Sequence, residues 1–249
     1  AVFDADVRRY LRFLEMSGGT LGLNGDGWAA FEDAAASLAD FMEDRNPGVV
    51  DLPELQTLKA HVRYSEAIAA IEVMGLEEDD AVFLDMPFYK TGRIRKDPIS
   101  EADVAVVLDL LNDVQPTHVF VAGDLSDPHG THRMCYQAIK QALQQYRADD
   151  PSDTPDPLVW LYRGAWQEWE IDRADIFLPL TKSDLNRKVE AIFKHESQKD
   201  RAMFPGAYDE REFWQRARDR NRETADTLNQ LGLPEFYAAE AFVTTHEMP

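Results

Sequence analysis

Two short apolar runs constrain the fold most strongly: "THVFVAGD" (117–124) and "PLVWLYRG" (157–164). Each is rich in Val, Phe, Trp or Tyr and has the length of a buried strand. A third run, "AVFLDMP" (81–87), precedes a helix-patterned stretch, 101–113, which follows the N-cap candidate Ser100. Strands that alternate with helices predict an α/β protein with a Rossmann-like, doubly wound, mostly parallel sheet.

Apolar residues at helical spacing recur in five further segments. These segments are 4–16, 27–44, 52–74, 182–196 and 209–231. The third ends at Gly75, a candidate for the glycine that follows a helix C-terminus. Residues 235–245 are expected to form a strand or an extended tail. Since no repeat, low-complexity run or linker-like stretch interrupts the chain, we expect one domain over residues 1–249.

The charge of the chain limits its partners. Acidic residues number 46 and basic residues 26, which gives a net charge of −20. Such a surface repels nucleic acid and anionic membranes, so neither is expected as a partner. The single cysteine, Cys135, excludes an internal disulfide. With no signal-peptide pattern and no run of 18 apolar residues, the sequence predicts a soluble, cytoplasmic protein.

The stretch "AGDLSDPHGTHR" holds two of the six histidines directly after an expected strand. Asp127 and Pro128 suit the N-cap and first position of a helix, which would place His129 and His132 on one face. Ligands bind beyond the carboxyl ends of parallel strands, so this is a plausible place for a metal or acid/base site. The pattern alone leaves open a capped helix with surface histidines.

Four features, in this order, resemble the PIG-L or LmbE family of zinc-dependent deacetylases. They are "RYSEAIAAIEVMG" (63–75), "VFLDMP" (82–87), the two-histidine stretch and "KVEAIFKHESQ" (188–198). The whole chain looks closest to the second half of long bacterial proteins named glucosamine-6-phosphate deaminases, in which a deaminase-like domain precedes a PIG-L-like one. The stretches "WLYRGAWQEWEI" and "FKHESQKD" add to that likeness.

The resemblance implies a zinc enzyme that hydrolyses the acetamide of an N-acetylglucosamine-type sugar, with or without a phosphate group. His132 would be a zinc ligand, His129 would stabilise or protonate the tetrahedral intermediate, and Arg63 would bind substrate. Thr131 stands where the family often has an aspartate that orients the second histidine. That role would then pass to Asp127 or Asp124.

The family's first motif, His-Pro-Asp-Asp, is absent from this sequence. In the family it supplies two zinc ligands and the base that takes a proton from the metal-bound water. Because the chain begins at Ala1, we expect the first strand and that motif to lie upstream, so that this chain alone would bind zinc poorly. The alternative is a degenerate, non-catalytic relative.

Three more residues are expected near a sugar. Arg93 belongs to the basic loop "YKTGRIRK" (89–96), which suits a phosphate or is simply a solvated loop. Arg163 follows the strand 157–164, and His195 stands in "HESQ", where it lines a crevice or caps a helix. Three functions remain open: a deacetylase on a small amino-sugar substrate, a glucosamine-6-phosphate deaminase or isomerase, and a sugar-binding or scaffold module. Homo-oligomerisation and fusion to an upstream deaminase-like domain are also left open.

Overall fold

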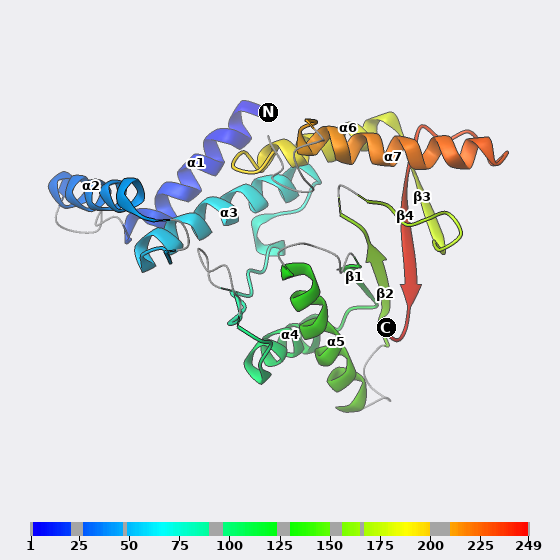
Figure 1. Ribbon diagram of the computed structural model, residues 1–249, viewed down its shortest axis with the longest axis horizontal. Coiled ribbons are helices and arrows are strands. Elements are labelled where there is room, and N and C mark those ends of the chain that lie inside the picture. The colour runs from blue at the N-terminus through cyan, green and yellow to red at the C-terminus, as the bar shows by residue number, and fades with distance from the viewer. Residues whose placement is uncertain are drawn as a thin grey trace. The chain divides into compact units, whose positions relative to one another are not determined.

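A computed structural model describes most of the chain. The described residues are 2–20, 27–46, 49–89, 97–123, 130–149, 156–164, 167–199 and 210–248. The helices are α1 (Val2–Gly18), α2 (Gly27–Asp44), α3 (Pro53–Val73), η1 (Glu78–Asp80), α4 (Glu101–Val114), α5 (Thr131–Asp149), α6 (Lys182–Lys194) and α7 (Phe213–Gln230) (Figure 1). The strands are β1 (His118–Ala122), β2 (Leu158–Tyr162), β3 (Ile176–Leu180) and β4 (Ala238–Thr245). No helix in these stretches is both long and apolar enough to cross a membrane.

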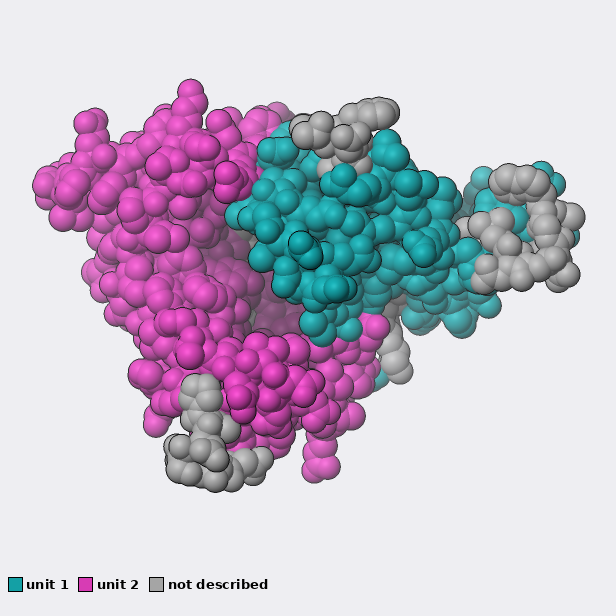
Figure 2. Space-filling view, turned by 180° about the vertical axis from the view of Figure 1, so that it is seen from behind, with its two compact units in different colours: residues 1–83, 89–97, 190–197 teal, residues 84–88, 98–189, 198–249 magenta. Residues whose placement is uncertain are grey.

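The chain divides into two compact units, which Figure 2 colours separately. Unit 1 consists of Ala1–Phe83, Tyr89–Asp97 and Glu190–Ser197. Unit 2 consists of Leu84–Phe88, Pro98–Val189 and Gln198–Pro249. The expectation of a single domain over residues 1–249 stays a prediction.

Unit 1 is helical, and its α1 and α3 pack against each other. Arg12 on α1 forms ion pairs with Glu72 on α3 and with Glu78. Helix α3 ends as the sequence predicted: Gly75 adopts a φ of +89°, and its N–H donates to the carbonyl of Glu72 at 3.1 Å. Glycine suits this position because a left-handed backbone costs it nothing.

Unit 2 contains a four-stranded sheet in the order β1-β2-β4-β3. Its core combines strand residues such as Val121, Val159 and Leu161 with residues of α4 and α5, including Leu143 and Tyr146. A second, smaller cluster joins Ala225 and Leu228 of α7 to Ala239 of β4. The described residues therefore form a mixed α/β protein in which helices outweigh the sheet.

The expected mostly parallel sheet is corrected by the strand pairing. Among the described strands, only β1 and β2 pair in parallel, whereas β4 runs antiparallel to both β2 and β3. The reason is that the 235–245 stretch returns as β4 between β2 and β3, a long-range pairing that no local pattern specifies. Strand β3 carries Pro179, and a proline is tolerated there because β3 is an edge strand.

The expected strand over 81–87 is also wrong, since these residues belong to no strand. Asp85 adopts a φ of 46°, which interrupts the pleat that a strand needs. Leu84 and Met86 still pack against the main core cluster. The apolar character of the run is thus explained by burial rather than by strand pairing.

Asp103 is the buried side chain that fixes the start of α4. Its Oδ2 accepts hydrogen bonds from the N–H and the hydroxyl of Ser100, at 2.8 and 2.6 Å, and its Oδ1 accepts one from the N–H of Phe88 at 2.8 Å. Burial by itself would raise the pKa of Asp103, but these hydrogen bonds stabilise the carboxylate and outweigh burial, so the pKa is lowered.

Replacing Asp103 with Asn should lower the free energy of unfolding at pH 7 by about 2 kcal/mol, because an amide cannot accept all three hydrogen bonds. A carboxyl whose pKa is depressed by folding stabilises the protein above its unfolded pKa, which is about 4 for aspartate. That contribution disappears as the pH falls through the lower, folded pKa. Urea unfolding at pH 7 and pH 3 should therefore show the difference between wild type and D103N shrinking at pH 3.

Asp109→Asn is the matched control, because Asp109 is exposed on the same helix. It should change stability by less than about 0.5 kcal/mol. A D103N effect of the same size at both pH values would contradict the assignment of the pKa shift to Asp103.

Candidate functional site

The seven site residues expected from the sequence fall into three groups. His129, Asp127 and Arg93 lie outside the described residues. Arg63 and His195 belong to unit 1, whereas His132 and Arg163 belong to unit 2.

In unit 1, a buried carboxylate joins two stretches that the sequence analysis had singled out. Glu66 on α3 is 2% exposed. Its Oε1 accepts the N–H of Ser197 and its Oε2 accepts the Ser197 hydroxyl, both at 2.7 Å. Arg9 on α1 is also buried, with its Nη1 3.9 Å from Glu66 Oε1 and donating to the carbonyl of Lys194 at 3.3 Å. The "RYSEA" and "HESQ" stretches, 131 residues apart, therefore meet through Glu66 and Ser197.

The two predicted substrate-binding residues of unit 1 lie in the electrostatic field of the same carboxylate. His195 is half-buried, and its pKa is lowered, chiefly by burial. The negative charge of Glu66 opposes that shift, and the positive charge of Arg63 adds to it. Arg63 is exposed on α3, so its guanidinium is accessible to a ligand. In unit 1, His195 therefore interacts electrostatically with both Arg63 and Glu66. The sequence analysis did not predict the part played by Glu66.

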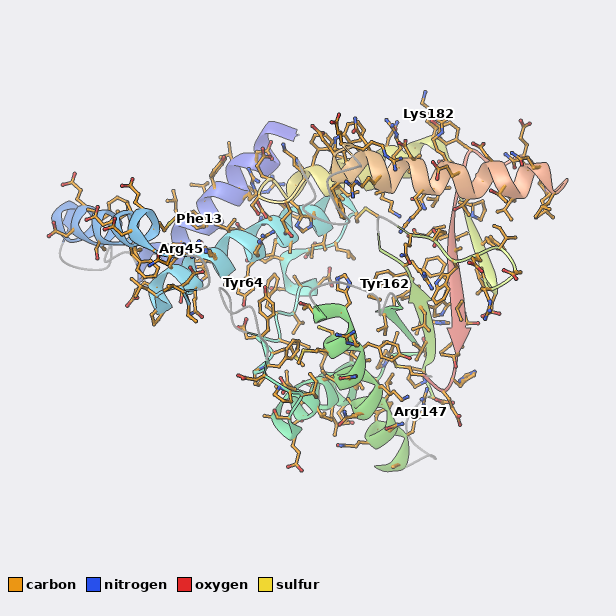
Figure 3. The ribbon with its side chains drawn as sticks, viewed as in Figure 1. Phe13, Arg45, Tyr64, Arg147, Tyr162 and Lys182 are labelled. Carbon is orange, nitrogen blue, oxygen red and sulfur yellow. The ribbon has the colours of Figure 1, made fainter. Side chains whose placement is uncertain are left out.

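A small, mostly apolar pocket of about 260 Å³ opens beside this carboxylate. Its lining residues come from α1, α3 and the segment after α6: Arg9, Tyr10, Phe13, Val62, Ser65, Glu66, Glu196 and Ser197. Figure 3 labels Phe13, and also Tyr64, whose ring stacks on Phe83 of the same unit at 4.1 Å.

In unit 2, His132 is the second residue of α5 and is half-buried. Helix α5 begins just after Gly130, whose φ of +68° turns the chain into the helix. Strand β1 ends at Ala122, so His132 follows the carboxyl end of a parallel strand, as the sequence predicted. The expected N-cap, Asp127 with Pro128, lies outside the described residues.

The part of the chain that the structure describes holds no group of three His, Cys, Asp or Glu side chains suited to a metal ion. A catalytic zinc site normally needs three protein ligands and an open position. His132 has the right chemistry for one of them, because a neutral imidazole is a common zinc ligand. The described residues alone therefore do not make a zinc site.

Arg163 follows the carboxyl end of β2 and lines a pocket of about 610 Å³ in unit 2. The other lining residues are Gln167, Glu168, Trp169, Glu170 and Arg173. The Arg163 guanidinium lies over the Trp169 ring at 4.2 Å, and its Nη1 donates to Gln167 Oε1 at 2.6 Å. Strands β1 and β2 are parallel neighbours, so the pocket lies at the edge of the sheet where both strands have their carboxyl ends. The chain leaves β1 at the same edge and continues toward His132.

A buried arginine that the sequence analysis missed holds this loop in place. Arg220 on α7 donates from Nη1 to the backbone carbonyls of Arg163, at 2.8 Å, and of Gly164. Its Nη2 donates to Glu240 on β4 at 3.0 Å, and its Nε lies 3.4 Å from Glu168 Oε2. Charged residues are normally placed on the surface by sequence reasoning, which is why Arg220 gave no signal. Glu66 and Ser197, in contrast, lay in motifs already noted.

Comparison with known proteins bears on the expected family. Residues 25–143 match the family model of PIG-L, described as GlcNAc-PI de-N-acetylase. The resemblance to the PIG-L family is confirmed. The matched residues include Arg63, Glu66 and His132, whereas Arg163 and His195 lie beyond them.

Two individual proteins are also similar to this chain. The chain is 41% identical over 243 residues to a protein of Bacteroides thetaiotaomicron named as glucosamine-6-phosphate deaminase-like. The match covers 98% of this chain and 36% of that relative, so the chain spans about a third of the relative's length. The crystal structure of GalB, the 4-carboxy-2-hydroxymuconate hydratase from Pseudomonas putida KT2440, superimposes with a TM-score of 0.52. That match covers 92% of this chain and 81% of GalB at 18% identity, and shows a shared fold.

The contact between Glu66 and Ser197 should be energetically coupled. In a double-mutant cycle with Glu66→Gln and Ser197→Ala, we expect a coupling energy of about 1–3 kcal/mol, because the alanine removes the hydrogen bond from the Ser197 hydroxyl to a buried carboxylate. Urea unfolding of the wild type, the two single variants and the double variant measures it.

Ser183→Ala is the control for that cycle, since Ser183 is exposed at the start of α6. Combined with Glu66→Gln it should give additive effects. Additivity in the Glu66–Ser197 cycle as well would show that this contact does not hold the two stretches together.

Proposed function

We propose that the intact protein is a zinc-dependent hydrolase that removes the acetyl group from an N-acetylglucosamine-type sugar. The observation that carries the proposal is the place of His132 within the PIG-L match, at the start of α5 and after the carboxyl end of β1. An imidazole at this edge of a parallel strand pair can reach a ligand bound beyond the strands.

Each expected site residue has a role in this proposal. His132 is a zinc ligand, while His129, oriented by Asp127, stabilises or protonates the tetrahedral intermediate formed at the amide carbon. Arg63, His195 and Arg163 are the residues that we propose to bind the sugar. Arg93, in the basic loop, is a further candidate for substrate binding.

The proposal assigns no catalytic step to zinc, because the described residues provide only His132 as a defensible ligand. The support for zinc is the family resemblance together with the imidazole chemistry of His132. We also propose that the single domain expected from the sequence has a Rossmann-like arrangement, of which the parallel β1–β2 pair is one part. Fusion to a deaminase-like domain is supported by the greater length of the relative.

A second candidate function is deamination of glucosamine 6-phosphate, which the name of the Bacteroides relative suggests. The two reactions release different products, acetate from the acetylated sugar and ammonium from the free amino sugar. Assays of both products on the same preparation therefore separate the candidates. Ammonium release without acetate release would replace the proposed function by the second candidate.

His132→Ala should remove bound zinc and abolish acetate release, because a catalytic site with one ligand fewer loses its metal. His129→Ala should keep zinc and lower kcat by about 10²–10³, the scale for losing one group that stabilises an oxyanion. Metal analysis of the purified intact protein, together with an acetate assay, measures both effects.

His246→Ala is the matched control, because the His246 side chain is 63% exposed. It should leave zinc content and acetate release unchanged. Equal zinc loss in the His132 and His129 variants would contradict the division of roles, and full zinc binding by His132→Ala would overturn the ligand assignment.

A further inference from the structure

The pocket around Arg163 is joined to the end of β1 by close packing. The N–H of Gly123 donates to the carbonyl of Tyr162 at 2.7 Å, just past the parallel pairing of the two strands (Tyr162 is labelled in Figure 3). A methyl group at Gly123 would lie 2.9 Å from the Trp169 ring. Only glycine lets the chain that leads toward His132 pass so close to the pocket wall. The pocket and His132 thus belong to one edge of one unit.

The side chains of this pocket are fixed by hydrogen bonds, yet one buried donor has no partner within the described residues. The Trp169 indole donates to the Leu161 carbonyl at 2.8 Å, which fixes the ring under the Arg163 guanidinium. Gln167 engages Nη1 of Arg163, whereas the buried Nε has no hydrogen-bond partner within the described part of the chain. A buried donor without a partner costs free energy that a bound acceptor would recover. The Nε side of a guanidinium is suited to a planar or tetrahedral anion.

The carboxylates of the pocket are suited to different partners. Glu168 is nearly buried, with its side chain 11% exposed, and its Oε1 accepts the N–H of Trp169 at 3.0 Å. Burial raises the pKa of Glu168 and outweighs the opposing effect of Arg220. The Glu168 carboxylate can accept a hydrogen bond from a sugar hydroxyl, and its ion pair with Arg220 offsets its charge.

Glu168 is the first of a row of alternating charges in unit 2, formed by Glu168, Arg220, Glu240 and Lys188. Arg220 bridges Glu168 and Glu240, and Glu240 accepts a hydrogen bond from Lys188 at 2.8 Å. Lys188 also donates to Asn221 at 3.0 Å. Because each charge has an opposite neighbour, the row is held rigidly and leaves Arg163 and Arg173 as the cations that line the pocket.

We propose that this pocket binds the phosphate-bearing part of a phosphorylated amino sugar. Arg163 and the exposed Arg173 hold the phosphate, while Glu168 and Glu170 accept sugar hydroxyls. The volume of about 610 Å³ is within the range of small-ligand sites and exceeds what a free phosphate ion needs. The inference rests on the proposed function, because it names the substrate class of the same protein.

The test compares N-acetylglucosamine 6-phosphate, N-acetylglucosamine and inorganic phosphate by isothermal titration calorimetry on the intact protein. We expect the phosphorylated sugar to bind at least about 10-fold more tightly than either of the other two. Arg163→Met should remove most of that advantage, since methionine keeps an apolar contact with Trp169 but has no guanidinium. Arg163→Lys should keep part of it, because it retains the charge and loses the fork.

Arg187→Met is the matched control, since Arg187 is exposed on α6 and does not line the pocket. It should leave all three affinities unchanged. Thermal unfolding of each variant checks that the fold is retained, and Arg163→Lys covers the case in which Arg163→Met does not fold. Equal affinity for the phosphorylated and unphosphorylated sugars, or an unchanged preference in both Arg163 variants, would overturn the inference.

The outcomes also separate this inference from the proposed function. Binding that depends on Arg163 but is accompanied by no acetate release from any of these sugars would uphold the pocket and overturn the deacetylase proposal. Acetate release that is equally efficient with and without the phosphate, and unaffected by Arg163→Lys, would uphold the deacetylase proposal and overturn the pocket.

Discussion

The parallel pairing of β1 with β2 is the constraint on which the candidate site of unit 2 depends. In a parallel pair both carboxyl ends lie at one edge, so the chain leaving β1 toward His132 and the chain leaving β2 at Arg163 start side by side. The hydrogen bond from Gly123 to Tyr162 extends this alignment one residue beyond the strand. A one-residue slip of β2 would turn Trp160 into the core and Leu161 out of it, so burial of Val159 and Leu161 fixes the register.

Strand register alone does not position a loop, and the loop after β2 is held by hydrogen bonds from the buried guanidinium of Arg220. Arg220 donates hydrogen bonds to the backbone carbonyls of Arg163 and Gln167 in that loop. An arginine in this place is costly unless its charge is balanced, and Glu240 and Glu168 provide that balance. Helix α7 has a strongly polar sequence, yet it packs against β4 through the Arg220–Glu240 ion pair. Two further kinds of contact join the same elements: Asn221 donates to the carbonyl of Ala239, and Ala225 and Leu228 pack against Ala239.

The sequence predicted what is local and failed on what is not. Apolar spacing located α3, α4 and both parallel strands, and Gly75 was identified because a left-handed turn after a helix favours glycine. The antiparallel return of β4 and the short strand β3 were not foreseen, since their pairing depends on partners far away along the chain. For 81–87, composition indicated a strand, yet the backbone of Asp85 breaks it. The roles of Arg63, His195, His132 and Arg163 stay predictions, and the burial of Glu66 and Arg220 followed from no local pattern.

Glu66 in unit 1 and Arg220 in unit 2 have the same structural role: each holds an irregular segment through its backbone groups. Each is a charged side chain more than nine-tenths buried that satisfies backbone groups of a segment lacking regular structure, Ser197 in one case and the loop after β2 in the other. Backbone groups in such segments have no ladder or helix partner, so a fixed charge is the strongest local substitute. In both cases the stabilised segment borders a pocket, and it carries or adjoins residues expected to touch a sugar. A binding loop must be rigid without being part of a strand or helix, and a buried ion anchored in a neighbouring helix meets both requirements.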